Sequence, residues 1–245
     1  MSLEEAAALL EPSDTLGVPL GTGVPAGLLE ELGKRTDWEE LRVYGALLFS
    51  GWDLFKQPNV HYLSGFYGPL ERGLRDEGAN ISFAPADFRR FAPLLEEQAP
   101  RVMGTVVTPP DDDGWCSLSL HAGGTATEMK RAAADPDRVL IAEASEKFPR
   151  TFGLEPDYRH GFHVDDIDVL VESDREPFPL VDPPPACSER LHQPSSSGGA
   201  TAVAITRGAC SSSSGAKRRK SAGAKLMFAP SSRSPRSSGP KNPER

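Results

Sequence analysis

The sequence predicts an α/β fold in which a mostly parallel sheet is covered by helices. The first reason is that short apolar runs alternate with stretches whose apolar residues recur at helical spacing. The second is the run Val139 to Ala142, which fits a strand buried on both faces and is followed by a second strand candidate, Ile167 to Val171. Strands that alternate with helices give parallel sheets, because each crossover needs a covering element.

The first half of the chain supplies clear start and stop signals. A capping box at Ser2 to Glu5 predicts a short helix over Glu4 to Leu10. The segment Gly51 to Gly65 is aromatic and irregular and predicts no element. The other elements expected here are a strand over Asp14 to Leu20, a helix with Pro25 in its first turn that ends near Lys34, a strand over Leu41 to Phe49, a helix over Gly68 to Glu77 and a strand over Ile81 to Phe83.

The second half continues the alternation. Asp87 is expected to cap a helix whose apolar residues lie on one face. Strands are expected over Arg101 to Val107 and Trp115 to Leu120, separated by an acidic turn over Pro109 to Gly114. A second capping box, Thr125 to Glu128, predicts a helix that ends near Ala134.

The loop between the last two strands is dense in ionisable groups, and loops at the carboxyl ends of parallel strands bind ligands. It carries Glu143, Lys147, Pro149, Arg150 and His163. Arg150 is the strongest candidate, because a guanidinium binds a carboxylate or a phosphate in a bidentate manner. The alternatives are an ion pair of Arg150 with Glu143 or Asp165, and, for the whole loop, solvated residues around a proline turn.

Two glycines after the first strand form a further candidate site. Gly21, Gly23 and Pro25 lie in a G-x-G-x-x-A run between a strand and a helix, which resembles a dinucleotide fingerprint. The acidic residue that such a fingerprint needs at the end of the second strand is absent. Free backbone N–H groups at a helix start attract anions, and the alternative is a tight turn that needs glycine.

The charge distribution divides the chain in two. Residues 1–182 hold 16 Lys and Arg against 33 Asp and Glu, whereas residues 183–245 hold 11 against 2. The acidic body argues against nucleic-acid binding. The three cysteines show no paired or metal-type spacing, and we expect no signal peptide, no membrane span and no bound metal. The expected location is the cytoplasm.

The C-terminal 63 residues differ in composition from everything before them, being rich in Ser, Pro, Gly, Ala and Arg. Such a segment buries too little apolar surface to fold, so residues 183–245 are expected to be a disordered, basic tail. The run Lys217 to Lys220 fits a polyanion-binding patch. The abrupt change near Pro185 also fits a shifted reading frame.

Several ordered motifs resemble the acetyl-CoA hydrolase/CoA-transferase family, which includes 4-hydroxybutyrate and acetate CoA-transferases. They are AEASEKFPRTFG followed by HVDDIDVLVE, the upstream SGFYGPLERGLRDEGANISFAPADFRRFAPLL, and TPPDDDGWCSLSL. The resemblance covers roughly residues 2–181 and implies that residues 1–182 form the first domain of such an enzyme. It places Gly21, Gly23, Pro25, Pro149, Arg150 and His163 along the cleft for substrate and CoA.

The resemblance also implies a chemistry in which a glutamate attacks an acyl-CoA thioester. In the family that glutamate follows a D-G-A-T-L-Q-like motif, which this chain lacks. We therefore assign no catalytic residue and expect the chain to be inactive alone. Cys116 is not expected to act as a nucleophile, since no His/Asn arrangement accompanies it.

The expected partners are an acyl-CoA and a small carboxylate, with the CoA thioester as a substrate and no bound cofactor. Two alternatives stay open: a non-catalytic CoA- or acyl-binding half that pairs with a separate subunit or with its own copies, and an interaction protein that binds polyanions through the basic tail. The acyl group, and the choice between transfer and hydrolysis, are not determined by these residues.

Overall fold

A computed structural model of the chain describes residues 1–121, 124–154 and 159–179. The expected tail, residues 183–245 with its run Lys217 to Lys220, lies outside the described residues. The helices of the described part are α1 (Leu3–Ala7), α2 (Ala26–Lys34), α3 (Pro69–Asp76), α4 (Phe88–Gln98) and α5 (Ala126–Ala133), with short 3₁₀ turns η1 (Gly21–Gly23), η2 (Asp53–Lys56) and η3 (Val164–Asp166).

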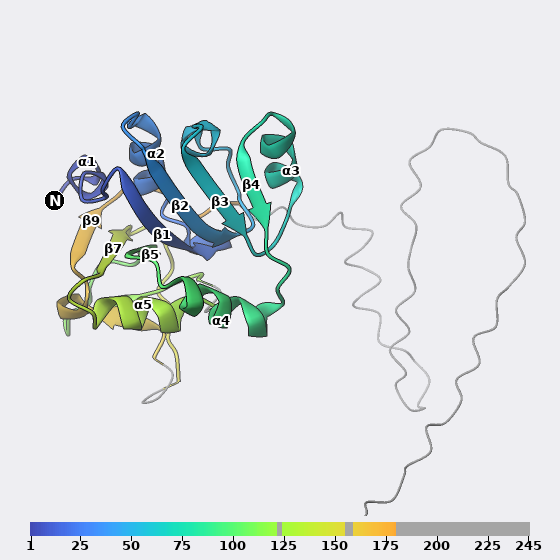
Figure 1. Cartoon of the computed structure of the whole chain (residues 1–245). Coiled ribbons are helices and arrows are strands. Elements are labelled where there is room, and N and C mark those ends of the chain that lie inside the picture. The colour runs from blue at the N-terminus through green and yellow to red at the C-terminus, as the bar shows by residue number, and fades with distance from the viewer. Residues whose placement is uncertain (122–123, 155–158, 180–245) are drawn as a thin grey trace, which may run out of the picture. The chain divides into compact units, whose positions relative to one another are not determined.

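Seven strands form one parallel sheet in the order β4-β3-β2-β1-β5-β7-β9 (Figure 1). The strands are β1 (Ser13–Leu20), β2 (Glu40–Ala46), β3 (Val60–Ser64), β4 (Asn80–Phe83), β5 (Val102–Val107), β7 (Val139–Ala144) and β9 (Val169–Glu172). Two short antiparallel strands, β6 (Trp115–Ser117) and β8 (Gly161–His163), pair beside this sheet. The α/β fold with a parallel sheet is confirmed.

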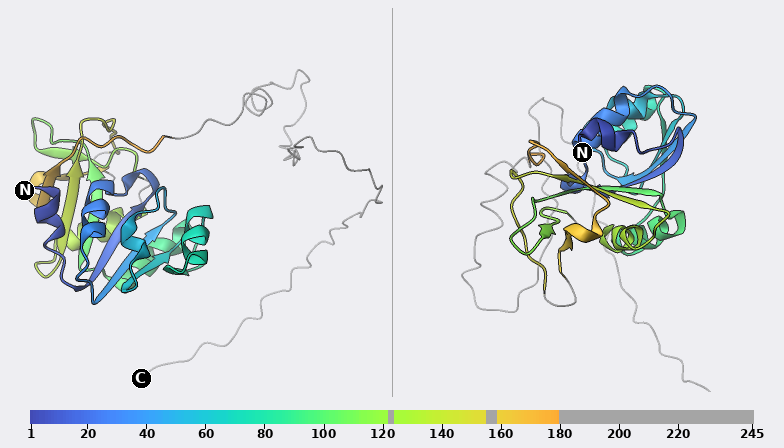
Figure 2. Two further views of the ribbon diagram at one scale, coloured as in Figure 1. Left: turned by 90° about the horizontal axis from the view of Figure 1, so that it is seen from above. Right: turned by 90° about the vertical axis from the view of Figure 1, so that its left-hand side faces the viewer.

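Helices cover both faces of the sheet. Figure 1 shows α1, α2 and α3 on one face and α4 and α5 on the other, and the edge-on view in Figure 2 separates the two layers. Because side chains alternate along a strand, a strand covered on both faces can contribute to two cores. In β5, Val102 belongs to the core under α1 to α3, and its neighbour Met103 belongs to the core under α4 and α5.

Most expected elements are found, and two strands were missed. β3 lies inside the segment that predicted no element, although Val60, Tyr62 and Ser64 alternate inward there. β8 lies in the loop before Ile167 and pairs with β6. β2 ends at Ala46, three residues before the expected end, because Leu47 takes a left-handed φ of 40° that breaks the strand.

The two predicted capping boxes have different outcomes. Ser2 and Glu5 form the first one, with reciprocal hydrogen bonds of 3.1 and 2.7 Å. The second was wrong: Thr125 caps nothing with its side chain, and its hydroxyl contacts His121 instead. Buried Glu128 forms an ion pair with Arg138, which leaves its carboxylate unavailable for the helix start.

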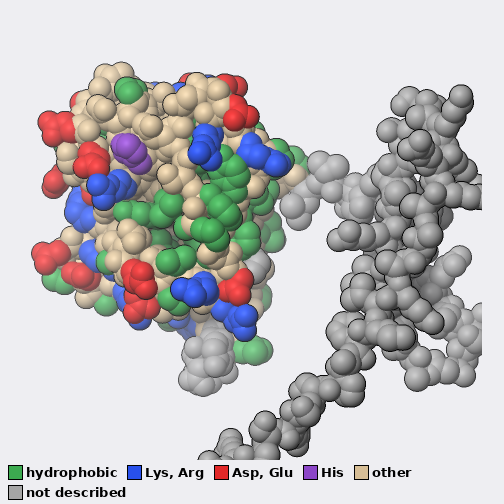
Figure 3. Space-filling view, turned by 45° about the vertical axis from the view of Figure 1, so that its right-hand side comes forward, with side chains coloured by type: hydrophobic (Ala, Val, Ile, Leu, Met, Phe, Trp, Pro, Cys, Tyr) green, Lys and Arg blue, Asp and Glu red, His purple; other side chains and the backbone are tan. Residues whose placement is uncertain are grey.

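One side of the molecule exposes hydrophobic side chains. Figure 3 brings forward the side that carries α3, β4 and α4, and apolar side chains gather in the middle of that face. Phe83, on the edge strand β4, is 47% exposed. A small apolar cavity lies between α4 and strands β2 and β3, and residues such as Leu63 and Leu94 line it.

Candidate functional site at the carboxyl edge of the sheet

The strand order places a topological switch point between β1 and β5. The chain lays β1 to β4 down in one direction and then returns to add β5 on the other side of β1. The loops that leave neighbouring strands diverge at such a point, and they open a crevice at the carboxyl ends of the strands. The loops that meet here are the turn after β1 and the loops after β5 and β7.

The turn after β1 contains Gly21, Gly23 and Pro25, and all three are buried. Gly21 has a φ of 70°, which glycine adopts without strain. A Cβ added to Gly23 would lie 2.8 Å from Cδ2 of His121, so only glycine fits. Pro25 packs over β5, because a Cβ on Gly104 would lie 3.1 Å from its Cγ. The predicted tight turn therefore has a steric reason at each glycine.

The start of α2 is occupied by a carboxylate of this chain. Buried Glu143, in β7, accepts hydrogen bonds from the N–H groups of Gly27 at 2.9 Å and Leu28 at 3.3 Å through one oxygen. Its other oxygen accepts from the hydroxyl of Ser173 at 2.7 Å. A substrate carboxylate would have to displace Glu143 to reach these two helix N–H groups.

A network of hydroxyl groups joins the glycine turn to the loop after β7. Ser119 lies at its centre with a φ of 52°, which is unusual for a residue other than glycine. Its hydroxyl donates to the carbonyl of Pro149 at 2.6 Å, and its carbonyl accepts from the hydroxyl of Thr151 at 2.9 Å. The next residue, Leu120, accepts at its carbonyl from the hydroxyl of Thr22 at 2.7 Å.

His121 is the buried histidine of this network. Its Nε2 lies 2.6 Å from Oγ1 of Thr125, and its ring packs against the glycine turn. Burial, with a smaller contribution from nearby His160, lowers the pKa of His121 to about 4. His121 is therefore neutral at pH 7 and serves as a packing and hydrogen-bonding group.

Arg150 braces the acidic turn after β5. One guanidinium nitrogen donates to Oδ2 of Asp111 at 3.0 Å and to the carbonyl of Trp115 at 2.9 Å, and the other donates to the carbonyl of Pro109 at 2.5 Å. The alternative of an ion pair was right in kind, but Glu143 and Asp165 were the wrong partners. Lys147, from the same loop, pairs with Asp174 instead.

His163 is tied to its own surroundings at the end of β8. Its Nε2 lies 3.1 Å from the carbonyl of Asp113, and its Nδ1 lies 3.2 Å from a carboxylate oxygen of Asp165. Its ring meets the edge of Trp115, with 5.3 Å between the ring centres. His163 and Asp165 therefore lie within ion-pair distance of each other, with His163 half-buried and Asp165 exposed.

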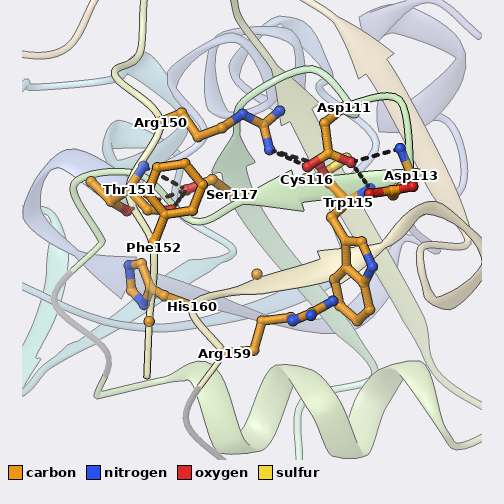
Figure 4. Close-up of a pocket in the computed structure, with 12 residues that line it drawn as sticks. Asp111, Asp113, Trp115, Cys116, Ser117, Arg150, Thr151, Phe152, Arg159 and His160 are labelled. Carbon is orange, nitrogen blue, oxygen red and sulfur yellow. Dashed lines mark hydrogen bonds and ion pairs between the residues drawn. The ribbon is translucent and has the colours of Figure 1, made fainter. Parts of the chain in front are cut away.

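A cleft of about 340 Å³ opens beside the hydroxyl network (Figure 4). The sticks in Figure 4 place Phe152 and His160 on one side and Trp115 on the other, with Arg159 reaching toward the indole ring. The guanidinium carbon of Arg159 lies 3.8 Å from the centre of that ring. Cys116 and Ser117 of β6 also line the cleft.

Cys116 is a free thiol with no exposed surface, and burial raises its pKa. A thiol in this state is a poor nucleophile at neutral pH, because the thiolate is the reactive form. Among the described residues, no group of three or more His, Cys, Asp or Glu side chains is arranged to hold a metal ion.

The structure groups the six candidate residues into two clusters and one outlier. Gly21, Gly23 and Pro25 form the first cluster, Pro149 and Arg150 belong to the second, and His163 lies apart from both, across β6. Ser119 connects the clusters, and sequence reasoning missed it because a left-handed serine leaves no pattern. Sequence reasoning also did not assign Trp115, Phe152, Arg159 and His160 to a site. The available signal was that the basic residues Arg159 and His160 are adjacent in the chain.

Comparison with known proteins identifies relatives of one kind. No family model matches the chain. It is 27% identical over 184 residues to succinyl-CoA:cyclohexane-1-carboxylate CoA transferase of Geobacter metallireducens, covering 74% of this chain and 40% of the relative. It is 25% identical over 190 residues to 4-hydroxybutyrate coenzyme A transferase of Clostridium kluyveri, covering 75% and 42%. The chain is therefore similar to two CoA transferases over about three-quarters of its length. It spans about two-fifths of the length of these curated relatives.

Solved structures agree on the fold. RipA from Yersinia pestis superposes with a TM-score of 0.61 at 22% identity, over 76% of this chain and 45% of RipA. A 4-hydroxybutyrate CoA-transferase from Porphyromonas gingivalis gives a TM-score of 0.52 at 14% identity, over 74% and 41%. In the part of this chain that the structure describes, no helix has the length and apolarity to span a membrane.

Proposed function

We propose that residues 1–182 form one wall of the active-site cleft of an acyl-CoA:carboxylate CoA-transferase or acyl-CoA hydrolase. The observation that carries the proposal is the sequence similarity to two CoA-transferases over three-quarters of the chain, together with a switch-point crevice in the same region. The substrates would be an acyl-CoA and a small carboxylate, in the cytoplasm, with acetate among the candidates.

The reaction would proceed through a glutamate supplied by a second domain or subunit. Its carboxylate attacks the thioester carbonyl, and the CoA thiolate leaves, so that an acyl-glutamyl anhydride forms. The thiolate then attacks the glutamyl carbonyl and releases the first carboxylate, leaving glutamyl-CoA. An acceptor carboxylate takes the CoA by the reverse steps, or water hydrolyses the thioester. The covalent intermediate divides one difficult exchange of CoA between two carboxylates into two easier attacks.

Two carboxylates at the carboxyl edge of the sheet, Glu143 and Asp111, are already engaged by groups of this chain, which supports a nucleophile from elsewhere. Glu143 is buried and accepts three hydrogen bonds. Asp111 accepts from the N–H groups of Asp113 and Trp115 and pairs with Arg150. A carboxylate whose oxygens already accept this many hydrogen bonds must give some of them up before it can attack a substrate. The chain by itself should therefore not form the covalent intermediate.

The direct test is to incubate the purified chain with acetyl-CoA, succinyl-CoA or 4-hydroxybutyryl-CoA and to measure released CoA and protein mass. We expect no CoA release above that of the heat-denatured chain and no covalent CoA adduct. An adduct on any carboxylate, removed by hydroxylamine, would contradict a nucleophile from elsewhere. Peptide mapping would then identify the residue.

A separate test asks where the domain or subunit that supplies the glutamate comes from. Sequencing the gene through codon 185, and translating the following bases in all three frames, should reveal a D-G-A-T-L-Q-like segment if the tail results from a shifted frame. Co-purification of another polypeptide of domain size would instead support a separate subunit. The exposed apolar residues Phe152 and Leu154 near the cleft favour such a covering partner.

A further inference from the structure

Helix α4 carries its charges in the order that an isolated helix disfavours. Arg89 and Arg90 lie in its first turn, and Glu96 and Glu97 lie in its last turn. A helix has a positive amino end and a negative carboxyl end, so a cation at the start and an anion at the end each cost stability. Pro93, inside the helix, also removes a backbone hydrogen bond. The solvent side of α4 is therefore not optimised for the stability of this chain alone.

Two of these four charges have partners in the chain, and two do not. Arg89 forms an ion pair with the residue that caps the helix, at 3.2 Å, and Glu96 forms one with Arg131 of α5 at 2.8 Å. Arg90 and Glu97 are both exposed, and neither forms an ion pair within the part of the chain that the structure describes. One cation and one anion of α4 are thus free to bind charges from outside.

The two free charges lie on one face of the helix with an apolar centre between them. Arg90 and Glu97 are seven residues, or almost two turns, apart, which separates them by about 10 Å along the helix axis. Between them on this face lie exposed Pro93 and half-buried Leu94. Leu94 also lines the small apolar cavity between α4 and the sheet, on the side of the molecule brought forward in Figure 3. The face thus runs from a cation through apolar groups to an anion.

We propose that this face of α4 binds the same face of a second copy of the chain in an antiparallel, two-fold symmetric dimer. Arg90 of each copy pairs with Glu97 of the other, and Pro93 of each packs on Leu94 of the other. A two-fold contact needs a self-complementary surface, and this order of charges is complementary to itself only when the helices are antiparallel. Each charge then also lies beside the end of the other helix that attracts it. The dimer is independent of the proposed function.

The contact is small, and the dimer it forms is a transient one. Interfaces of stable complexes bury about 1,200–2,000 Å², and one helix face from each copy supplies less than this. Residues 1–182 hold 16 Lys and Arg against 33 Asp and Glu, so two copies repel each other at long range. We therefore expect a dissociation constant on the order of 10–100 µM.

Sedimentation velocity at chain concentrations from about 5 to 500 µM measures this constant. The starting protein is the full chain with Phe152 and Leu154 replaced by serine, so that association through these exposed side chains does not contribute. R90E and E97R should each raise the dissociation constant at least about tenfold, because each change creates two like-charge pairs across the dimer. Both changes place a charge at the helix end that favours it, so loss of the dimer would not reflect unfolding of α4.

Two combinations should restore the dimer. The double variant R90E/E97R exchanges the charges in both copies, and an equimolar mixture of R90E and E97R brings an acidic face against a basic one. Each should return the dissociation constant to within about threefold of that of the starting protein. The matched control is K130E, which makes the same change of charge at an exposed position of α5, on the same side of the sheet, and should leave the constant unchanged.

Three outcomes would overturn the inference. A starting protein that is monomeric at the highest concentration would remove the dimer. A dimer that R90E and E97R leave intact would be formed by another surface. Loss of the dimer in both single variants, with no rescue in the double variant, would exclude the antiparallel pairing. None of these results bears on the transferase proposal, because that is tested by CoA release and adduct mass.

Discussion

The glycine turn, Gly21 to Pro25, and the segment Thr151 to Leu154 both follow the carboxyl ends of strands, but their surfaces differ. The turn is buried, and its neighbours His121, Glu143 and β5 close around it. In the second segment Phe152 and Leu154 are 84% and 75% exposed. The glycine turn is fully packed by this chain's own residues, whereas the second segment exposes apolar surface of the kind that partners or ligands cover.

Removing the carboxylate behind the turn should have the largest effect on stability. E143A leaves the N–H groups of Gly27 and Leu28 and the hydroxyl of Ser173 without their buried acceptor. We expect the free energy of unfolding, measured with urea, to fall by about 3 kcal/mol. E143Q should cost less, because its amide oxygen still accepts hydrogen bonds.

Glu146, exposed in the same loop, provides the control. E146A should change the free energy of unfolding by less than about 0.5 kcal/mol. If E143A lowered the free energy of unfolding as little as E146A, the glycine turn would not depend on the hydrogen bonds that Glu143 accepts at the start of α2.

Acid should destabilise the same region through His121. Its pKa is lowered from 6.5 to about 4 in the folded protein, so below pH 6.5 the unfolded chain takes up a proton that the folded protein does not. The contribution of His121 to stability is thus unaffected above pH 7 and falls as the pH drops toward 4, by about 3 kcal/mol. Urea titrations at several pH values measure it.

Because carboxylates also titrate in this range, the comparison is with H121N. The stability of this variant should fall less steeply with acid than that of the wild type. Parallel curves would mean that His121 is protonated in the folded protein.

A methyl group at Gly23 should cost somewhat less. In G23A the new Cβ would lie 2.8 Å from the ring of His121 and 3.0 Å from Cβ of Pro19, so one of them must move. We expect a loss of about 2 kcal/mol in urea unfolding. The control is G73A, at an exposed position of α3 where a Cβ meets nothing within 4 Å. It should stabilise the protein by about 0.5–1 kcal/mol, as alanine favours helices. If G23A lowered the free energy of unfolding by much less than this, the turn would be less closely packed against His121 and Pro19 than described.

The exposed segment should respond in the opposite way. Replacing Phe152 and Leu154 by serine removes exposed apolar surface and few packing contacts, so stability should change by less than about 0.5 kcal/mol. Self-association should decrease, as measured by sedimentation velocity, because the wild type is expected to form oligomers through uncovered apolar surface. A wild type that is monomeric at every concentration would contradict this expectation.

Local signals in the sequence predicted most of the fold. The Ser2 to Glu5 capping box, the Asp87 cap and the apolar run after Arg138 involve residues within a few positions of each other, and each was found. The site depends on longer separations. Glu143 binds a helix start 116 positions earlier, and Arg150 braces Asp111 across 39 positions. Such partners are chosen by the tertiary fold, so composition and periodicity could place the loops but not their contacts.

The cap supplied by Glu143 has a consequence for biosynthesis. Gly27 leaves the ribosome 116 residues before Glu143 does. At translation rates of about 5–20 residues per second, the nascent turn waits roughly 6–23 seconds for the carboxylate that completes it. During that interval the α2 start is open to water and to any other anion, so a chain arrested before β7 would display the glycine turn as an uncapped, chaperone-accessible end.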